Sequence, residues 1–518
     1  YSQRRVEAIY IYLKKGCLIK DLVDASIIIL DNENKMIPKW TAQIAKEYGE
    51  KPALFKVIND TQEKVFVRFN TYKPGTVTTK VWEDSDIFDA FIKYNERNLL
   101  GKDLCYITGE KKQQADKHLN GLRRPGDKAK LISANDTSGY TYRGRFSKAN
   151  EVASISYDVS QKAHHALKWL VSKQGKTIDE RVFLVWGNKE TEIISPQEDV
   201  LTYFEQIGVD VSEDHYTNTH AMYAEQFNKA IDGYKSSLSY NSKVIILVLD
   251  SATTGRLAVL YYQQLDTKEY LERIKNWHQT CTWRHFYKKN NEDKFIEFYG
   301  APATKDIALA AYGARASDKL IKEAMARLLP CIVAGQKVPI DIVRSAFYRA
   351  SRPVSMEKWE WEKTLSIACA LLNKHYEKEG YSVSLDVTNK NRDYLFGRLL
   401  AVADVLERSG LDAEEKRATN AIRYMNAFAM HPARTWKIIQ ANIQPYQVKL
   451  GTKATYYCKL LDEIASEIDY EDFNDKPLSG VFLLGFYCQR HDLYKGKKEK
   501  DSESINLTED DNNENPRS

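Results

Sequence analysis

The spacing of apolar residues changes near residue 317, and this change constrains the fold more than any other feature of the sequence. Before it, short apolar or alternating runs are interspersed with helical spacing, which predicts a mixture of strands and helices. After it, apolar residues recur three or four positions apart over long stretches, which predicts stacked helices. We therefore expect an α+β protein, with a mixed α/β N-terminal half followed by a helical region ending in a C-terminal helical bundle.

The individual elements follow from the same periodicities. The predicted strands are Ala25–Leu30, Val65–Tyr72, Asp103–Thr108, Arg181–Trp186, Lys243–Leu249 and Arg256–Gln263. Helices are predicted first over residues 4–15, Asp84–Asn95, Ser156–Gln174 and Met222–Tyr234. Later helices are predicted over Ser317–Leu329, Ile340–Ala350, Glu357–Glu379, Arg392–Ser409, Ala413–His431 and Lys453–Ile468. Thr253-Thr254-Gly255 predicts a hairpin turn between the last two strands, and Lys73-Pro74-Gly75 predicts another turn.

Cysteine usage and hydropathy indicate the compartment. The seven cysteines are scattered, with no C-x-x-C pair and no His at zinc-ligand spacing, which is typical of buried thiols in a reducing cytoplasm. The sequence has neither a signal peptide nor a run of about 18 apolar residues, so we expect a cytoplasmic protein that does not span a membrane. The chain begins at Tyr1 rather than at a methionine, so we expect that residues precede it in the full protein.

No motif in the sequence predicts catalysis. Two adjacent histidines, His164 and His165, would point about 100° apart on a helix and could not easily share one metal ion. Asp84-Ser85-Asp86 could hold a metal as a carboxylate pair, but a helix N-cap explains it more simply. Glycine-rich phosphate loops and the G-x-S-x-G motif are absent. We expect a binding protein with no catalytic residues, no metal and no cofactor.

Positive charge is concentrated between Lys111 and Lys148. This stretch contains ten Lys and Arg residues but only three Asp, an excess of seven positive charges, whereas the whole chain has a net charge of only +5. The stretch from Gly121 to Phe146 also contains glycines, short polar side chains and two tyrosines, which suit phosphate contact, base-edge contact and stacking. A solvated basic loop with turn glycines explains the composition equally well.

We select ten candidate DNA-binding residues, two of them from the turn around Lys73. They are Asn70, Lys73, Arg123, Arg124, Lys128, Lys130, Asn135, Tyr142, Arg143 and Arg145. For the turn alone, a purely structural role is the commoner outcome.

Six passages resemble one protein family in the same order along the chain. They are Asp103–Glu110 (DLCYITGE), Lys128–Phe146 (KAKLISANDTSGYTYRGRF), Ala153–Leu170 (ASISYDVSQKAHHALKWL), Arg181–Gly187 (RVFLVWG), Asn373–Glu379 and Asp393–Glu407 (DYLFGRLLAVADVLE). Because of these passages, the chain resembles the large subunit of the type I-C CRISPR Cascade complex over about residues 94–489. Arg143 departs from the family pattern, so the role implied for this position is open.

The resemblance implies a non-catalytic subunit at the end of a crRNA-guided complex that holds the 5′ handle. Such a subunit recognises the protospacer-adjacent motif in duplex DNA, promotes R-loop formation, supports the displaced strand and recruits the helicase–nuclease. Its implied partners are crRNA, the backbone and crRNA-processing subunits, the small subunit, target double-stranded DNA and the helicase–nuclease. The C-terminal region is also made separately in this family, and a start near Asn391 or at Met356 is compatible with that.

At roughly 100–200 residues per domain, 518 residues predict three or four domains, and the charged, polar composition of the last residues predicts a tail. We expect an N-terminal motif-reading domain (1–150), a mixed α/β body (151–315), a helical connector (316–390), a C-terminal helical bundle resembling the Cascade small subunit (391–495) and a disordered tail (496–518). The basic residues that could line the bundle for the displaced strand are Arg392, Arg398, Arg423, Arg434 and Lys437. Ordinary surface charge remains an alternative for each of them. The alternative functions are a metal-dependent nuclease subunit and a protein-only scaffold of a ribonucleoprotein.

Overall fold

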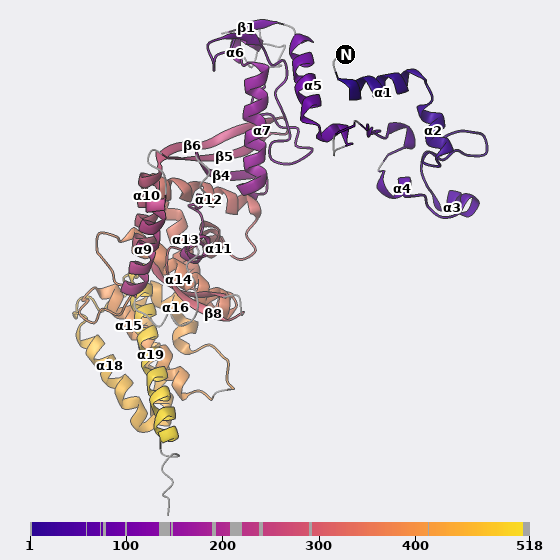
Figure 1. The fold of residues 1–518 in the computed structure, drawn as a ribbon. Coiled ribbons are helices and arrows are strands. Elements are labelled where there is room, and N and C mark those ends of the chain that lie inside the picture. The colour runs from indigo at the N-terminus through magenta and orange to yellow at the C-terminus, as the bar shows by residue number, and fades with distance from the viewer. Residues whose placement is uncertain are drawn as a thin grey trace, which may run out of the picture. The chain divides into compact units, whose positions relative to one another are not determined.

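The computed structural model divides the chain into two compact units (Figure 1). It describes residues 3–58, 60–72, 74–75, 79–98, 101–133, 146, 149–188, 193–207, 220–237, 242–289, 293–412 and 414–510. Unit 1 comprises residues 1–118 and 134–162, and unit 2 comprises residues 119–133 and 163–518. The combination of small antiparallel sheets with a helical C-terminal region confirms the expected α+β fold.

Unit 1 is built from short helices and one small sheet. Its helices are α1 (Arg4–Lys14), α2 (Leu18–Asp24), α3 (Ala42–Tyr48), α4 (Ala53–Val57), α5 (Ser85–Asn98) and α6 (Ala149–Val152), with 3-10 turns η1 (Gln62–Lys64) and η2 (Val81–Glu83). Strands β1 (Lys102–Leu104) and β2 (Lys111–Gln113) pair antiparallel. Helix α7 (Tyr157–Gln174) begins in unit 1 and continues into unit 2. Asp84 caps α5 as predicted, because its carboxylate accepts the amide of Asp86 at 3.0 Å.

Two predicted strands of unit 1 are wrong, Ala25–Leu30 and Val65–Tyr72. In the first, the buried side chain of Gln62 takes the place of a neighbouring strand: its Oε1 accepts the amide of Ile29 at 3.0 Å and its Nε2 donates to the carbonyl of Ile29 at 2.9 Å. In the second, the apolar alternation meets no sheet, and Phe66 is 97% exposed. Apolar alternation produces a strand only where a partner strand and a core are available.

Unit 2 begins with a four-stranded antiparallel sheet in the order β3–β4–β5–β6 (Figure 1). Its strands are β3 (Lys176–Ile178), β4 (Arg181–Gly187), β5 (Lys243–Thr253) and β6 (Arg256–Asp266), and the β5–β6 hairpin confirms the predicted one. Helix α7 packs on one face through Leu167, Leu170 and Val171. The other face joins a large core that continues into the helical region.

The remaining elements of unit 2 are mostly helices. They are α8 (Val200–Ile207), α9 (His220–Ser237), α10 (Thr267–Thr280), α11 (Thr304–Tyr312), α12 (Asp318–Val333), α13 (Ile340–Ala350), η4 (Pro353–Ser355), α14 (Lys358–His375), α15 (Arg392–Gly410), α16 (Asn420–Met430), α17 (Pro432–Leu450), η5 (Gly451–Lys453), α18 (Ala454–Ser466) and α19 (Val481–Asp510). A second sheet pairs β7 (Trp283–Lys289) with β8 (Phe295–Gly300).

The C-terminal helices surround α15, most of whose residues are buried. Its closest neighbour is α19: a Cβ atom on Gly397 would lie 1.9 Å from the carbonyl oxygen of Phe482, so the two backbones meet where no side chain fits. The sequence did not predict α17 or α19. Helix α19 is drawn to Asp510, and the domain boundaries expected from the sequence, including a disordered tail from residue 496, stay predictions.

Candidate nucleic-acid interface

The basic segment enters unit 2 as a folded loop, residues 119–133. Two backbone hydrogen bonds close it: the amide of Gly121 donates to the carbonyl of Asp127 (2.8 Å), and the amide of Asp127 donates to the carbonyl of Arg124 (3.1 Å). Gly126 allows the turn because its φ is +83°, a conformation that glycine adopts without steric cost. Leu122 and Ala129 are buried in a small apolar cluster that includes a residue of β6.

The same loop is joined to the tip of the β5–β6 hairpin by its backbone. The amide of Lys130 donates to the carbonyl of Gly255 at 3.1 Å, and the amide of Leu257 donates to the carbonyl of Lys130 at 2.9 Å. These two bonds form a parallel β-bridge between Lys130 and Arg256. The position of the Lys130 backbone is therefore set by the sheet.

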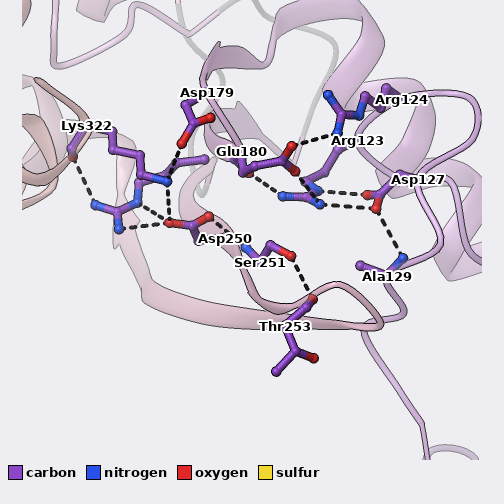
Figure 2. A network of polar contacts seen from close by, with 11 residues as sticks. Arg123, Arg124, Asp127, Ala129, Asp179, Glu180, Asp250, Ser251, Thr253 and Lys322 are labelled. Carbon is purple, nitrogen blue, oxygen red and sulfur yellow. Dashed lines mark hydrogen bonds and ion pairs between the residues drawn. The ribbon is translucent and has the colours of Figure 1, made fainter. Parts of the chain in front are cut away.

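Arg123 anchors the loop from inside, as Figure 2 shows. Its side chain is only 4% exposed, and its Nε atom donates to Oδ2 of Asp127 at 2.7 Å. Its Nη2 atom lies 2.8 Å from Oε2 of Glu180, whose other oxygen is 2.6 Å from Nη2 of Arg124. Hydrogen bonds to Asp127 raise the pKa of the Arg123 guanidinium, so it stays charged within this network.

Asp127 completes the anchor. Burial opposes ionisation of its carboxyl group, but the hydrogen bonds from Arg123 and from the amide of Ala129 (3.1 Å) outweigh burial and hold the pKa of Asp127 below its ordinary value. The carboxylate is therefore ionised at neutral pH. It fixes residues 123, 127 and 129 relative to one another.

A second group of ion pairs lies beside the first, across the β3–β4 turn (Figure 2). Nζ of Lys322 on α12 is 2.7 Å from Oδ2 of Asp179 and 3.5 Å from Oδ2 of Asp250. The buried Arg181 donates to Asp250 at 2.9 Å and to the backbone carbonyl of Lys322 at 3.0 Å. These residues were not predicted from the sequence, although the charged triplet at 179–181, directly before an apolar strand, was a signal that could have indicated them.

The basic residues of the loop therefore fall into two classes, those that form ion pairs and those that do not. Arg123 and Arg124 are neutralised by Asp127 and Glu180. Lys128 is exposed and Lys130 is half-exposed, and neither forms an ion pair within the described part of the chain. A rigid loop that holds two such ammonium groups at the surface can bind phosphate without first losing much conformational entropy.

The other predicted DNA contacts are placed differently. Asn70 is exposed in unit 1, where it forms an isolated bridge with Lys80. Five predicted residues lie outside the described residues, namely Lys73, Asn135, Tyr142, Arg143 and Arg145. Their contact with DNA remains a prediction.

The five basic residues predicted to face the displaced strand fall into two groups. Arg392 donates to the backbone carbonyls of Asp472 (2.7 Å) and Lys476 (3.0 Å), and so holds that loop against the start of α15. The side chain of Arg398 is buried and donates to Gln489 on α19 at 2.9 Å. The exposed members of the set are Arg423 on α16 and Arg434 and Lys437 on α17.

The described residues contain no group of three or more His, Cys, Asp or Glu side chains that could hold a metal ion. On α7, His164 is buried and His165 is exposed, so the two rings lie on different sides of the helix. Burial lowers the pKa of His278 and of His285 to about 3, which leaves both rings neutral at physiological pH. Across the described residues, no helix is long and apolar enough to cross a membrane.

Comparison with known protein families gave a match. The family model described as CRISPR-associated protein (Cas_Csd1) matches residues 1–494, nearly the whole chain and both structural units. A search of curated proteins found no match.

Proposed function

The chain belongs to the CRISPR-associated protein family Cas_Csd1, and from this premise we propose that it is the non-catalytic large subunit of a type I-C Cascade. In this role it recognises the protospacer-adjacent motif in duplex DNA and promotes R-loop formation. It also supports the displaced strand and recruits the helicase–nuclease. Its partners are crRNA, the other Cascade subunits and target double-stranded DNA.

One observation carries the DNA-binding part of this proposal: the anchored loop with its two surface lysines. The guide RNA reads the target by base pairing, so the protein needs only to recognise a short duplex motif and the DNA backbone. Backbone recognition requires cations at fixed positions. Lys128 and Lys130 meet this requirement because Arg123 and Asp127 hold the loop from within and the hairpin holds it from outside.

We assign the displaced strand to the surface that carries Arg423, Arg434 and Lys437. These three side chains are exposed on consecutive helices, whereas Arg392 and Arg398 are engaged with other parts of the bundle. Single-stranded DNA needs a basic surface that follows its backbone and does not require base-specific contacts. The triple substitution Arg423→Ala, Arg434→Ala and Lys437→Ala should therefore leave motif binding intact and reduce protection of the displaced strand against a single-strand-specific nuclease.

The experiment that tests motif binding uses the assembled complex and a target duplex. Lys128→Ala combined with Lys130→Ala should weaken binding by at least about tenfold, since each lost phosphate contact removes a salt-dependent share of the affinity. The matched control is Lys305→Ala combined with Lys319→Ala, which removes two exposed lysines elsewhere in unit 2. Equal binding by the two double variants would overturn the assignment of the loop.

The same preparation tests the nuclease alternative. Purified chain and assembled complex are incubated with plasmid and Mg²⁺ or Mn²⁺. We expect no cutting by either preparation without the helicase–nuclease. Cutting that disappears on His165→Ala or Asp86→Ala would replace the proposed role with that of a metal-dependent nuclease.

A further inference from the structure

Strand β6 forms one edge of the four-stranded sheet (Figure 1). Its inner side pairs with β5 along its whole length. On its outer side, within the described residues, the pairing is limited to the single bridge with Lys130, which ends at the amide of Leu257. From Val259 to Asp266 the described structure places no strand against this edge.

The hydrogen-bond pattern shows which backbone groups face outward. The amide of Thr267 donates to the carbonyl of Ser242 at 3.0 Å, so this pair bonds across the β5–β6 ladder. Paired residues of an antiparallel ladder alternate between bonded and non-bonded positions. The amide and carbonyl groups of Gln264 and Tyr262 therefore point away from β5. Leu260 has no partner in the register, since Tyr261 faces Val248 and Val259 faces Leu249, so regular pairing is available from Tyr261 onward.

The side chains of this edge lack the features that usually prevent pairing. Residues 257–265 (LAVLYYQQL) contain neither a charge nor a proline, which are the common means of protecting an edge strand. Val259 and Leu260 are each 49% exposed and Tyr262 is 60% exposed. The one protective feature is the irregularity at Leu260, and it leaves the following five residues available.

We propose that the outer edge of β6, from Tyr261 to Leu265, receives one additional strand from a partner protein of the same complex. The partner segment is extended, uncharged and apolar, its backbone pairs with Tyr262 and Gln264, and its side chains pack on Leu260 and Tyr262. The identification of the partner as a Cascade protein rests on the proposed function. The continuity of this edge with the existing Lys130 bridge defines where the added strand can begin.

Protein fits this edge better than nucleic acid. The outward groups alternate between donors and acceptors, which an extended peptide backbone matches and a phosphate backbone, having only acceptors, does not. Between Arg256 and Asp266 the strand has no cation for a phosphate, and Asp266 would repel one. Of the two lysines proposed to bind phosphate, Lys130 is bridged to Arg256 at the beginning of the strand, before this stretch.

The test measures hydrogen exchange of residues 259–266 in the isolated chain and in the purified complex. We expect the outward amides of Tyr262 and Gln264 to exchange at least about tenfold more slowly in the complex. Exchange at the same rate in both preparations would overturn the proposal. Protection that appears when DNA alone is added would assign the edge to nucleic acid and overturn it too.

Charged substitutions give a second readout. Leu260→Lys combined with Tyr262→Lys should reduce co-purification of one protein component by at least about tenfold, because lysines on an edge oppose strand addition. The control is Val448→Lys combined with Tyr470→Lys, two apolar positions of unit 2 that are 82% and 96% exposed. Equal losses in the two double variants would contradict the proposal. Light scattering of the isolated chain gives the other contradicting outcome: a dimer of the parent chain that dissociates in the edge variant would mean that the edge binds a second copy of this chain. Circular dichroism melts confirm that both variants fold.

The two proposals fail separately. If the edge is unprotected while the Lys128 and Lys130 variant loses DNA binding, only the strand addition is wrong. If the edge is protected while that variant binds DNA normally, only the role of the loop is wrong.

Discussion

The two units of this chain differ in how they use apolar residues. Unit 2 buries them in three clusters, the largest of which runs from the sheet to the last helix. None of these clusters includes a described residue of unit 1, which buries a few apolar side chains such as Ile37 and Phe55 but leaves Phe91 64% exposed and Tyr94 66% exposed. Unit 2 is therefore held together by its own extensive core, whereas unit 1 presents exposed apolar side chains that a binding partner could cover.

The largest expected effect concerns the packing of unit 2. Gly397→Ala places a methyl group against the backbone of α19 and should lower the free energy of unfolding by about 3 kcal/mol or more. Urea unfolding followed by tryptophan fluorescence measures this. In the control, Gly233→Ala on α9, the added methyl group meets no atom within 4 Å, so we expect a gain of up to about 1 kcal/mol. Equal changes in the free energy of unfolding for the two variants would show that the backbones of α15 and α19 do not pack as closely as described.

The next effect separates the two classes of charge in the loop. Arg123→Ala leaves the carboxylate of Asp127 buried without its partner, which should destabilise the loop by about 3 kcal/mol. Lys128→Ala removes an exposed side chain and should cost less than about 0.5 kcal/mol. Hydrogen exchange across residues 121–131 measures both. Faster exchange in the Lys128 variant than in the Arg123 variant would reverse the assignment of anchor and contact.

The stability that the ion pair between Arg123 and Asp127 gives to the loop should also depend on pH. Asp127 has a pKa below its ordinary value in the folded protein, so its contribution is complete above the unfolded pKa of about 4 and is lost as the pH falls through the folded value. Asp127→Asn should therefore be less stable than the parent chain by about 1–2 kcal/mol at pH 7. The difference should shrink as the pH approaches about 3. A difference that does not change with pH would exclude the ion pair as its source.

The smallest effect is expected in unit 1. Phe91→Ser on α5 changes a side chain that is largely exposed, so the stability of the isolated chain should change by less than about 0.5 kcal/mol. Limited proteolysis and urea unfolding of the isolated variant check this. A loss of several kcal/mol would mean that Phe91 belongs to a core within unit 1 and would remove the contrast between the units.

The same contrast explains what could be predicted from the sequence. The hairpin strands β5 and β6 and the helix Ile340–Ala350 were predicted correctly because a core enforces their periodicity. The strands predicted at Ala25–Leu30 and Val65–Tyr72 do not form. In the first, the side chain of Gln62 bonds to the backbone where a partner strand was expected, and in the second the side chain of Phe66 is exposed to solvent.

The candidate site shows the same limit. Its basic loop was found from the local excess of charge. Its anchor was not found, because Glu180 lies more than fifty residues from Arg123 in the sequence and only the fold brings them together. Composition identified all four basic side chains of the loop but could not distinguish the two arginines that form ion pairs from the two lysines at the surface.

The central claim is that Lys128 and Lys130 contact DNA phosphates from a rigid loop. The most direct test is the salt dependence of target binding by the assembled complex. Each phosphate contact contributes about 0.9 to the slope of log affinity against log salt concentration, so the variant without both lysines should bind with a slope smaller in magnitude by about 1.8. A variant whose slope equals that of the parent complex would contradict the claim.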